Sequence, residues 1–395
     1  MKGDYCLSFV VILQLVVTVL QLILPIYGFA TVERAASLRM LVTVVTYVAA
    51  IYYVFKRRPS ALILSFLFYA VFLLYNYLLY PDSHEFIESN RSYTLTPISI
   101  LTVLIITSIR DFDCFQKVLL YVSRVCPVIA LVYIYGRGIG AGLLQDQDYA
   151  YSMSMGYSFL LPCLFLFSQQ KIIDELLSIV LFLVIVLDGS RGPVVIIAIF
   201  YLYQALFATK INTKKGWVVL VVAFLGVFAF SYLMRSGFFE ESRTISLIAS
   251  EELISYDSGR GEITPIVKRK IAENPILGYG VGADRGIIGG YVHNIFLEIF
   301  LHYGIVVGII LFTIFFYWCF KLYFNKNFLQ YNGGRLFFIM MFLFGFVPML
   351  VSGSYLIDIS FAVMIGYLLR FNVTKKQVKF SSRYENIHHG NYRLA

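Results

Sequence analysis

A histidine stands where a polar, turn-rich segment of the chain changes into a long apolar one. The segment runs from Asn274 to Gly304 and reads NPILGYGVGADRGIIGGYVHNIFLEIFLHYG, with His293 at the change. An imidazole titrates near neutral pH and can take a proton from a hydroxyl group. At a membrane surface, this position is accessible to water, lipid head groups and a lipid-linked substrate. The pattern indicates a base for hydroxyl chemistry, and the alternative interpretation is a structural histidine.

Three polar residues follow on one face of the same apolar stretch. Asn294, Glu298 and His302 are spaced as neighbours on a helix surface. Glu298 and His302 would lie about one and two turns inside the membrane, where ionisable groups need partners. This pair could orient Asn294 or lock the helix packing, and we favour packing for His302. Asp358, inside the last apolar span, is likewise expected to meet a partner in the bundle interior.

Two arginines occupy turns that could hold an anion. Ser190–Pro193 forms a tight turn between two apolar segments, with Asp188 just before it. The guanidinium of Arg191 could bind phosphate oxygens in pairs, or it could snorkel and pair with Asp188. Arg260 lies between two glycines at the start of an amphipathic helix, whose N-terminus favours an anion. The alternative for Arg260 is an ordinary capping loop.

The composition identifies the elements that must position these residues as membrane helices. Of the 395 residues, 59% are hydrophobic and 14% are charged, whereas soluble domains carry about 45–50% apolar and about 25% charged residues. The first apolar run is too long for a signal-peptide core and lacks a cleavage site, so a transmembrane helix is predicted there. Cytoplasmic loops explain the net charge of +9, and no nucleic acid is expected as a partner.

Apolar runs predict an all-α polytopic membrane protein with about twelve transmembrane helices. The predicted spans are 7–29, 38–55, 60–80, 95–109, 125–143, 151–169, 173–188, 193–209, 216–234, 293–320, 336–350 and 354–371. Lysine and arginine gather in alternate short loops and in the C-terminal tail, which predicts that both termini are cytoplasmic. Because Arg124 should lie outside the hydrocarbon, 112–123 is predicted as a separate amphipathic cytoplasmic helix.

The spans divide the chain into four regions. These are an N-terminal transmembrane bundle of about nine spans (1–234), a large outer loop (235–292), C-terminal transmembrane helices (293–371) and a polar cytoplasmic tail (372–395). The loop is expected to contain two short helices, 243–256 and 262–273, the second stopped by Asn274 and Pro275. This topology places both arginine turns and His293 on the outer side.

Several kinds of chemistry lack support in the sequence. It contains no P-loop and no HExxH or comparable metal-binding motif. The five cysteines have neither metal-site nor CxxC spacing. We therefore expect no cofactor and no metal.

The order of the motifs resembles the bacterial O-antigen polymerase and O-antigen ligase superfamily. Ser190–Gly192 (SRG) comes first and is followed by Arg260 before an amphipathic helix. Then come ENPILGYG (Glu273–Gly280) and HNIFLEIFLHYGIVVG (His293–Gly308). The motifs cover about 185–310, and elsewhere the resemblance is one of topology and size.

The resemblance implies a GT-C-like, metal-independent glycosyltransferase at the outer (periplasmic) face of the bacterial inner membrane. Its donor and acceptor would be undecaprenyl-diphosphate-linked glycans within the lipid bilayer, and a flippase and a chain-length regulator would be its partners. Arg191 and Arg260 would hold the diphosphate, and His293 would activate the acceptor hydroxyl; these three are the expected catalytic residues. The expected substrate-binding residues are Ser190, Asn274, Gly278, Gly280, Arg285, Asn294 and Arg243.

The favoured reaction is polymerisation of lipid-linked repeat units into O-antigen or capsular polysaccharide. An O-antigen ligase, which transfers the polymer to lipid A–core, uses the same donor and is the first alternative. A flippase or polysaccharide transporter is the second alternative. It would need charged residues along a path through the membrane, whereas these arginines gather at the outer side.

Overall fold

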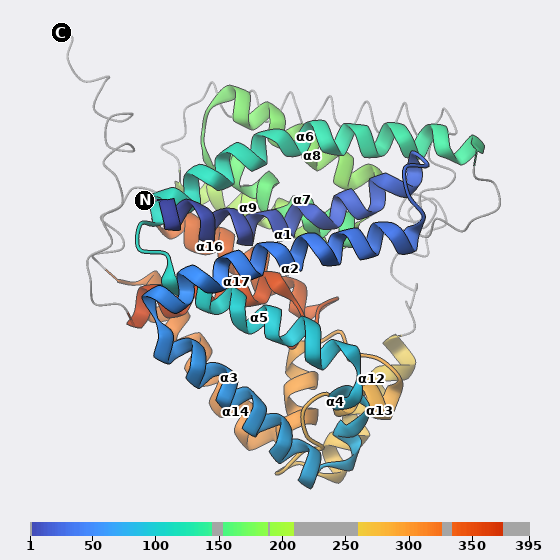
Figure 1. Ribbon diagram of the computed structural model, residues 1–395, viewed down its shortest axis with the longest axis vertical. Coiled ribbons are helices and arrows are strands. Elements are labelled where there is room, and N and C mark those ends of the chain that lie inside the picture. Colours follow the sequence, from blue (N-terminus) through green and yellow to red (C-terminus); the bar gives the residue numbers. More distant parts are fainter. Residues whose placement is uncertain (1, 144–152, 189, 209–259, 326–333, 374–395) are drawn as a thin grey trace. The chain divides into compact units, whose positions relative to one another are not determined.

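The computed structural model describes residues 2–143, 153–188, 190–208, 260–325 and 334–373, and every regular element within these ranges is a helix (Figure 1). The predicted span 216–234, the predicted loop helix 243–256 and Arg243 lie outside the described residues. The prediction of an all-α protein is confirmed for the described part of the chain.

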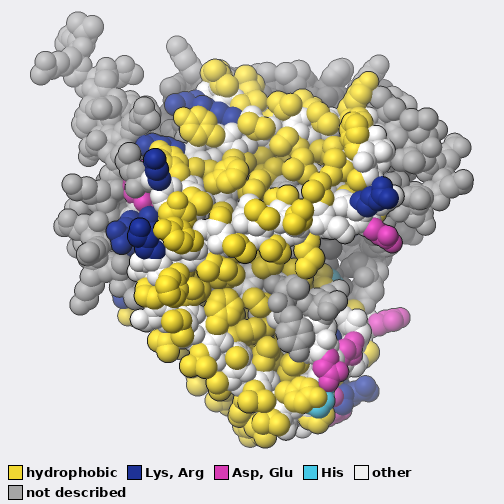
Figure 2. All heavy atoms as spheres, in the orientation of Figure 1, with side chains coloured by type: hydrophobic (Ala, Val, Ile, Leu, Met, Phe, Trp, Pro, Cys, Tyr) yellow, Lys and Arg dark blue, Asp and Glu magenta, His cyan; other side chains and the backbone are white. Residues whose placement is uncertain are grey.

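Five of the described helices contain a stretch long and apolar enough to cross a membrane: α1 (Lys2–Ile26), α2 (Val32–Arg57), α3 (Pro59–Leu79), the part Phe112–Gly136 of α6 (Phe112–Leu143), and α14 (Ile295–Tyr323). Shorter apolar stretches lie in α5 (Asn90–Ser108), α7 (Met153–Ser168), α9 (Arg191–Tyr203), α16 (Gly334–Gly345) and α17 (Ile359–Val373). Many apolar side chains of α2 and α3 are exposed, and they contribute to the hydrophobic surface in Figure 2. A multi-pass membrane protein is therefore confirmed, and the count of about twelve spans stays a prediction.

The chain forms two compact units. Unit one consists of residues 1–15, 40–121 and 259–395, and unit two of 16–39 and 122–258. In unit one, α17 packs against α5, α16 and α14, while α12 (Arg260–Glu273) packs against α14. In unit two, α7 packs against α8 (Ile172–Leu187) and α9. The division into four sequence regions stays a prediction.

Helix α6 differs from the prediction. The chain continues as one helix through Arg124, so the expectation of a separate helix at 112–123 is wrong. The Arg124 guanidinium donates from Nε and Nη2 to the two carboxylate oxygens of the buried Asp174, at 2.7 and 2.9 Å. A bidentate ion pair of this kind lets an arginine lie within an otherwise apolar helix.

The helix predicted before Asn274 is present. Helix α12 covers that stretch, and its apolar residues Ile263, Val267 and Ile271 face a cluster that includes Leu301 of α14. The short elements η1 (Pro81–Ser83), α4 (His84–Glu88) and α13 (Ala283–Ile288) were not predicted. Helix α13 packs against α4 and η1.

The last helix begins later than predicted. Helix α17 starts at Ile359, so Asp358 precedes the helix and does not lie within it. Its Oδ1 accepts hydrogen bonds from the backbone N–H groups of Ser360 (2.8 Å) and Phe361 (3.3 Å). A carboxylate in this position satisfies donors that a helix start leaves unpaired, so Asp358 is a helix cap.

Candidate active site

Helix α14 is broken at Gly304. The glycine has φ 77° and ψ 167°, values outside the helical region, and it separates a short leg (295–303) from a long leg (305–323). The rings of Phe296 and Phe312 lie equally far along the chain from the break, and their centroids are 4.5 Å apart. The short leg therefore bends back toward the long leg. Only glycine suits this point, because a Cβ here would collide with the carbonyl group of Ile276.

The NPILGYG motif satisfies the backbone groups that the break exposes. Ile305 N–H donates to the Pro275 carbonyl at 2.7 Å. The loop also donates to the helix: Tyr279 N–H bonds the Leu301 carbonyl and Gly280 N–H bonds the His302 carbonyl, each at 2.9 Å. Polar backbone groups at a helix end need such partners. The two motifs found in the sequence are therefore halves of one structure, a loop docked on a helix break.

Asn274 and Gly278 set the shape of this loop. The Asn274 Nδ2 donates to the Gly278 carbonyl at 2.6 Å, closing the turn. Gly278 has φ 68°, and a Cβ on it would lie 2.6 Å from the Gly304 nitrogen and 2.7 Å from the His302 carbonyl. The expected role of Asn274, Gly278 and Gly280 in substrate binding stays a prediction, whereas the contacts described here shape the loop and dock it on α14.

Gly278→Ala is expected to destabilise unit one by about 2–5 kcal/mol, from a left-handed alanine and from overpacking against backbone. Chemical unfolding of the purified protein in detergent measures the change. Gly290→Ala is the matched control, because a Cβ at Gly290 meets no heavy atom within 4 Å. Equal unfolding midpoints for the two variants would contradict the docked-loop geometry.

Residues of α3, η1 and α4, in the N-terminal half of the chain, also contact this loop. The buried Asn76 of α3 accepts a hydrogen bond from Val281 N–H at 2.8 Å. Ser83 donates to the Tyr279 carbonyl at 3.4 Å, and a Cβ on Gly282 would overlap the ring of Phe86. Asn76, Ser83 and Phe86 are site-supporting residues that the sequence analysis missed. For Asn76, a single amide side chain in the apolar stretch of α3 was the available signal.

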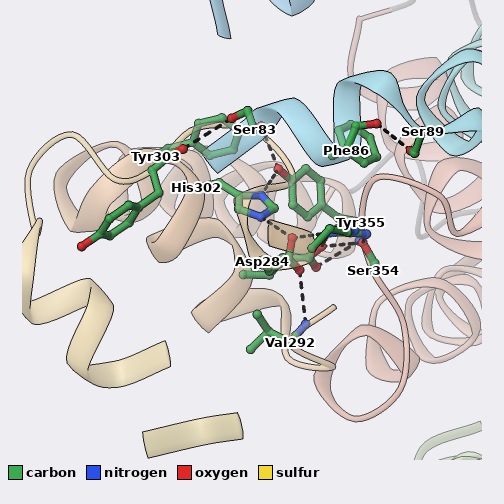
Figure 3. A network of polar contacts seen from close by, with 12 residues as sticks. Ser83, Phe86, Ser89, Asp284, Val292, His302, Tyr303, Ser354 and Tyr355 are labelled. Carbon is green, nitrogen blue, oxygen red and sulfur yellow. Dashed lines mark hydrogen bonds and ion pairs between the residues drawn. The ribbon is translucent and has the colours of Figure 1, made fainter. Parts of the chain in front are cut away.

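A buried network of charged side chains lies behind the loop (Figure 3). Arg285 is 5% exposed and forms ion pairs with Asp284 and Glu298, the second at 3.2 Å. Its Nη2 donates to Ser354 Oγ at 2.9 Å, and the Ser354 hydroxyl donates to Glu298. Arg285 thus ties α13 to the short leg of α14 and to the loop before α17. These contacts give it a role in holding the loop.

His302 completes the network. Its Nε2 lies 3.0 Å from Asp284 Oδ1, and its Nδ1 lies 2.8 Å from the Tyr355 hydroxyl. That hydroxyl also donates to the Tyr303 oxygen, at 2.7 Å. Each buried polar or charged side chain of the network thus has a partner, as burial requires.

The charges also control the ionisation of Asp284. Burial by itself would raise the pKa of this carboxyl, but the neighbouring His302 and Arg285 bring the pKa below its usual value. Asp284 also accepts from Val292 N–H at 3.3 Å, one residue before His293. The stabilisation by this carboxylate is present at neutral pH and is lost only as the pH falls through its lowered pKa.

Within the described residues, one group could offer three ligands to a metal ion. Asp284, Glu298 and His302 have ligand atoms within 4.8 Å of one another. The Arg285 guanidinium contacts both of these carboxylates and supplies the positive charge that a cation would supply. The donor set is therefore better suited to an internal ion-pair network than to a metal.

His293 is held in an unusual conformation just before α14. Its φ is 58°, in the left-handed region that residues other than glycine rarely adopt. Its Nδ1 lies 3.3 Å from the Ser352 carbonyl, and its ring is 4.2 Å from that of Tyr291, centroid to centroid. Strain of this kind is common where a side chain is positioned for function.

Asn294, expected to bind substrate, caps α14. Its Oδ1 accepts from the N–H groups of Phe296 (3.0 Å) and Leu297 (3.2 Å). The cap fixes where the helix begins and thereby where His293 stands. Arg260 is the first residue of α12. Both belong to unit one, with Arg285 and His293.

Ser190 and Arg191 belong to unit two. Arg191 is the first residue of α9, and the buried Ser190 lies just before it. Ser190 Oγ donates to Asp188 Oδ2 at 3.0 Å, and the Tyr133 hydroxyl donates to the other oxygen at 3.1 Å. Asp188 therefore holds the turn that presents Arg191 at a helix N-terminus, where anions are favoured.

These observations describe a helical, multi-pass membrane protein. Its candidate active site holds a histidine in a left-handed conformation beside a glycine-rich loop. Residues 176–313, which include Arg191, Arg260 and His293, match the family described as O-Antigen ligase. The match confirms the resemblance to the O-antigen polymerase and ligase superfamily, whose members transfer glycans.

One relative supports the same class. The chain is 23% identical over 234 residues to the ComP-specific O-oligosaccharyltransferase of Acinetobacter baylyi (strain ATCC 33305 / BD413 / ADP1). The aligned region is 56% of this chain and 41% of that protein, so the chain matches less than half the length of this relative. No solved structure matches the chain.

Proposed function

We propose that this protein transfers a glycan from a lipid-linked diphosphate, and that it polymerises undecaprenyl-diphosphate-linked repeat units into O-antigen or capsular polysaccharide. The observation that carries the proposal is His293, a family-motif histidine kept in a left-handed conformation between a docked glycine loop and the Ser352 carbonyl. The match over 176–313 supports transfer of a lipid-linked glycan as the reaction class.

His293 would act as the base. When Nδ1 donates to the Ser352 carbonyl, the neutral ring carries its lone pair on Nε2. Nε2 takes the proton of an acceptor hydroxyl as its oxygen attacks the anomeric carbon of the donor sugar. The bond from that carbon to the diphosphate oxygen breaks, and undecaprenyl diphosphate leaves with the electron pair. The product gains the transferred glycan.

Arg191 and Arg260 would neutralise the leaving diphosphate. Each is the first residue of a helix, where backbone N–H groups add favourable potential for an anion. A guanidinium keeps its charge and pairs with phosphate oxygens, which makes a metal unnecessary for this step. The site would face the periplasm from the inner membrane, with both termini in the cytoplasm. A flippase and a chain-length regulator would be partners.

Ligase or oligosaccharyltransferase activity is the second candidate. It is favoured by the match to the family described as O-Antigen ligase and by the similarity to a ComP-specific O-oligosaccharyltransferase. Deletion of the gene in its own host separates the two. Loss of a polymerase leaves single repeat units on the final acceptor, whereas loss of a ligase leaves full-length polymer on undecaprenyl diphosphate. Unchanged glycans of both kinds would contradict both candidates.

Arg191→Ala and Arg260→Ala are each expected to stop glycan transfer in cells while the protein remains inserted and folded. Losing a charge that stabilises a leaving group costs about 10²–10³-fold in rate. Gel analysis of extracted glycans measures the product, and membrane abundance is measured in parallel. Lys268→Ala, on the exposed face of α12, is the control and should retain the product. Normal product from both arginine variants would contradict the diphosphate clamp.

A further inference from the structure

Two large apolar side chains are exposed at the turn between α12 and α13. Ile276 and Leu277 are 66% and 64% exposed. They belong to the docked NPILGYG loop, whose backbone is fixed by hydrogen bonds to α14. They are adjacent, and a contiguous exposed apolar surface is typical of a contact with a membrane or a partner.

The backbone contacts fix where this turn lies along α14. Ile305 N–H donates to the Pro275 carbonyl at 2.7 Å, and the Ile276 carbonyl faces Gly304. The turn therefore sits at the beginning of the long leg. At about 1.5 Å per residue, this leg is about 28 Å long, close to the roughly 30 Å hydrocarbon core of a bilayer.

Exposure along α14 changes at the same point. The long leg exposes large apolar side chains, among them Val306 (55%), Ile309 (54%) and Ile310 (53%). The short leg exposes none of its large apolar residues. Lipid-facing surface of α14 thus begins at the break, and Ile276 and Leu277 continue that surface onto the turn.

We propose that the Pro275–Leu277 turn enters the hydrocarbon of the bilayer leaflet on its side and anchors the glycine-rich loop to the membrane. The occupant of this apolar surface is lipid acyl chain. The long leg of α14 crosses the bilayer, and Gly304 marks where the helix leaves the hydrocarbon. Glu298 and His302, which precede the break, belong to the covered short leg and not to the lipid-crossing leg. The turn then fixes the depth of the break in α14 relative to the membrane surface.

Fluorescence quenching by lipid tests this anchor without an activity assay. Leu277→Cys is labelled with an environment-sensitive fluorophore, in a Cys6→Ala background, because the other four cysteines are buried. The protein is placed in nanodiscs whose acyl chains are brominated. Val306→Cys on the long leg is the lipid-facing reference, and Glu273→Cys, exposed on α12, is the aqueous reference.

The expected loss of fluorescence at Leu277 is at least about half of that at Val306 and well above that at Glu273, as for apolar side chains buried below the lipid head groups. Quenching no greater than at Glu273 would overturn the proposal. So would protection from both brominated lipid and aqueous iodide, which would indicate a protein contact. Because the readout needs no substrate, a failed anchor would leave the proposed glycan transfer standing, and inactivity would leave the anchor standing.

Discussion

Replacing Arg285 by alanine is expected to lower the free energy of unfolding by about 3–5 kcal/mol, because removal of one partner leaves buried charges uncompensated. Asp284 and Glu298 would both lose their guanidinium contact, and Ser354 would lose a donor. Unfolding of the purified protein by denaturant in detergent measures the change. Lys268→Ala is the surface control, with an expected change within about 0.5 kcal/mol.

A double-mutant cycle separates this network from general damage. Glu298→Ala should also be destabilising, but the double variant should lose less than the sum of the single losses, by about 0.5–3 kcal/mol. The reason is that each single change already removes the same ion pair, in which Arg285 Nη1 lies 3.2 Å from Glu298 Oε1. Additive losses would contradict direct pairing of Arg285 with Glu298. A loss below about 0.5 kcal/mol for Arg285→Ala would contradict the buried network itself.

His293→Asn is expected to reduce glycan transfer by about 10²–10⁴-fold, the usual contribution of a positioned base. The choice of asparagine matters, because it tolerates positive φ better than most residues. Since the backbone at His293 has φ 58°, this variant should fold with an unchanged unfolding midpoint. A His293→Ala variant would combine the loss of the imidazole with the backbone strain of an alanine at positive φ. Transfer by His293→Asn at the wild-type rate would contradict the assignment of the base.

The membrane helices were the most predictable part of the fold. A long apolar run predicts both that the segment is a helix and that it lies in the membrane. Helix α3 (Pro59–Leu79), for example, lies within one residue of the predicted span 60–80. Helix α12 was predicted because its apolar residues recur with helical spacing and a proline follows it. Arg124 was misinterpreted because its partner, Asp174, is 50 residues away and only folding brings the two together.

The motif spacing predicted which residues belong to the candidate site, but not how they act on one another. Gly278 and Gly304 were noted as glycines of two motifs, and their close approach needed the positive φ angles of both. Asn76 lies 205 residues from Val281, so no local pattern could reveal that hydrogen bond. Glu298 and His302 were interpreted as parts of the scaffold, and the structure adds the partners that make their burial tolerable, Arg285 for Glu298 and Asp284 for His302.

The most direct test of the central claim is a transfer assay with the purified protein in nanodiscs, supplied with an undecaprenyl-diphosphate-linked repeat unit. Released undecaprenyl diphosphate and newly formed glycosidic bonds are counted together. The account predicts that wild-type protein forms the two in equal numbers without added metal and that His293→Asn forms almost none. Wild-type protein that releases no undecaprenyl diphosphate, or a His293→Asn variant that matches it, would contradict the account.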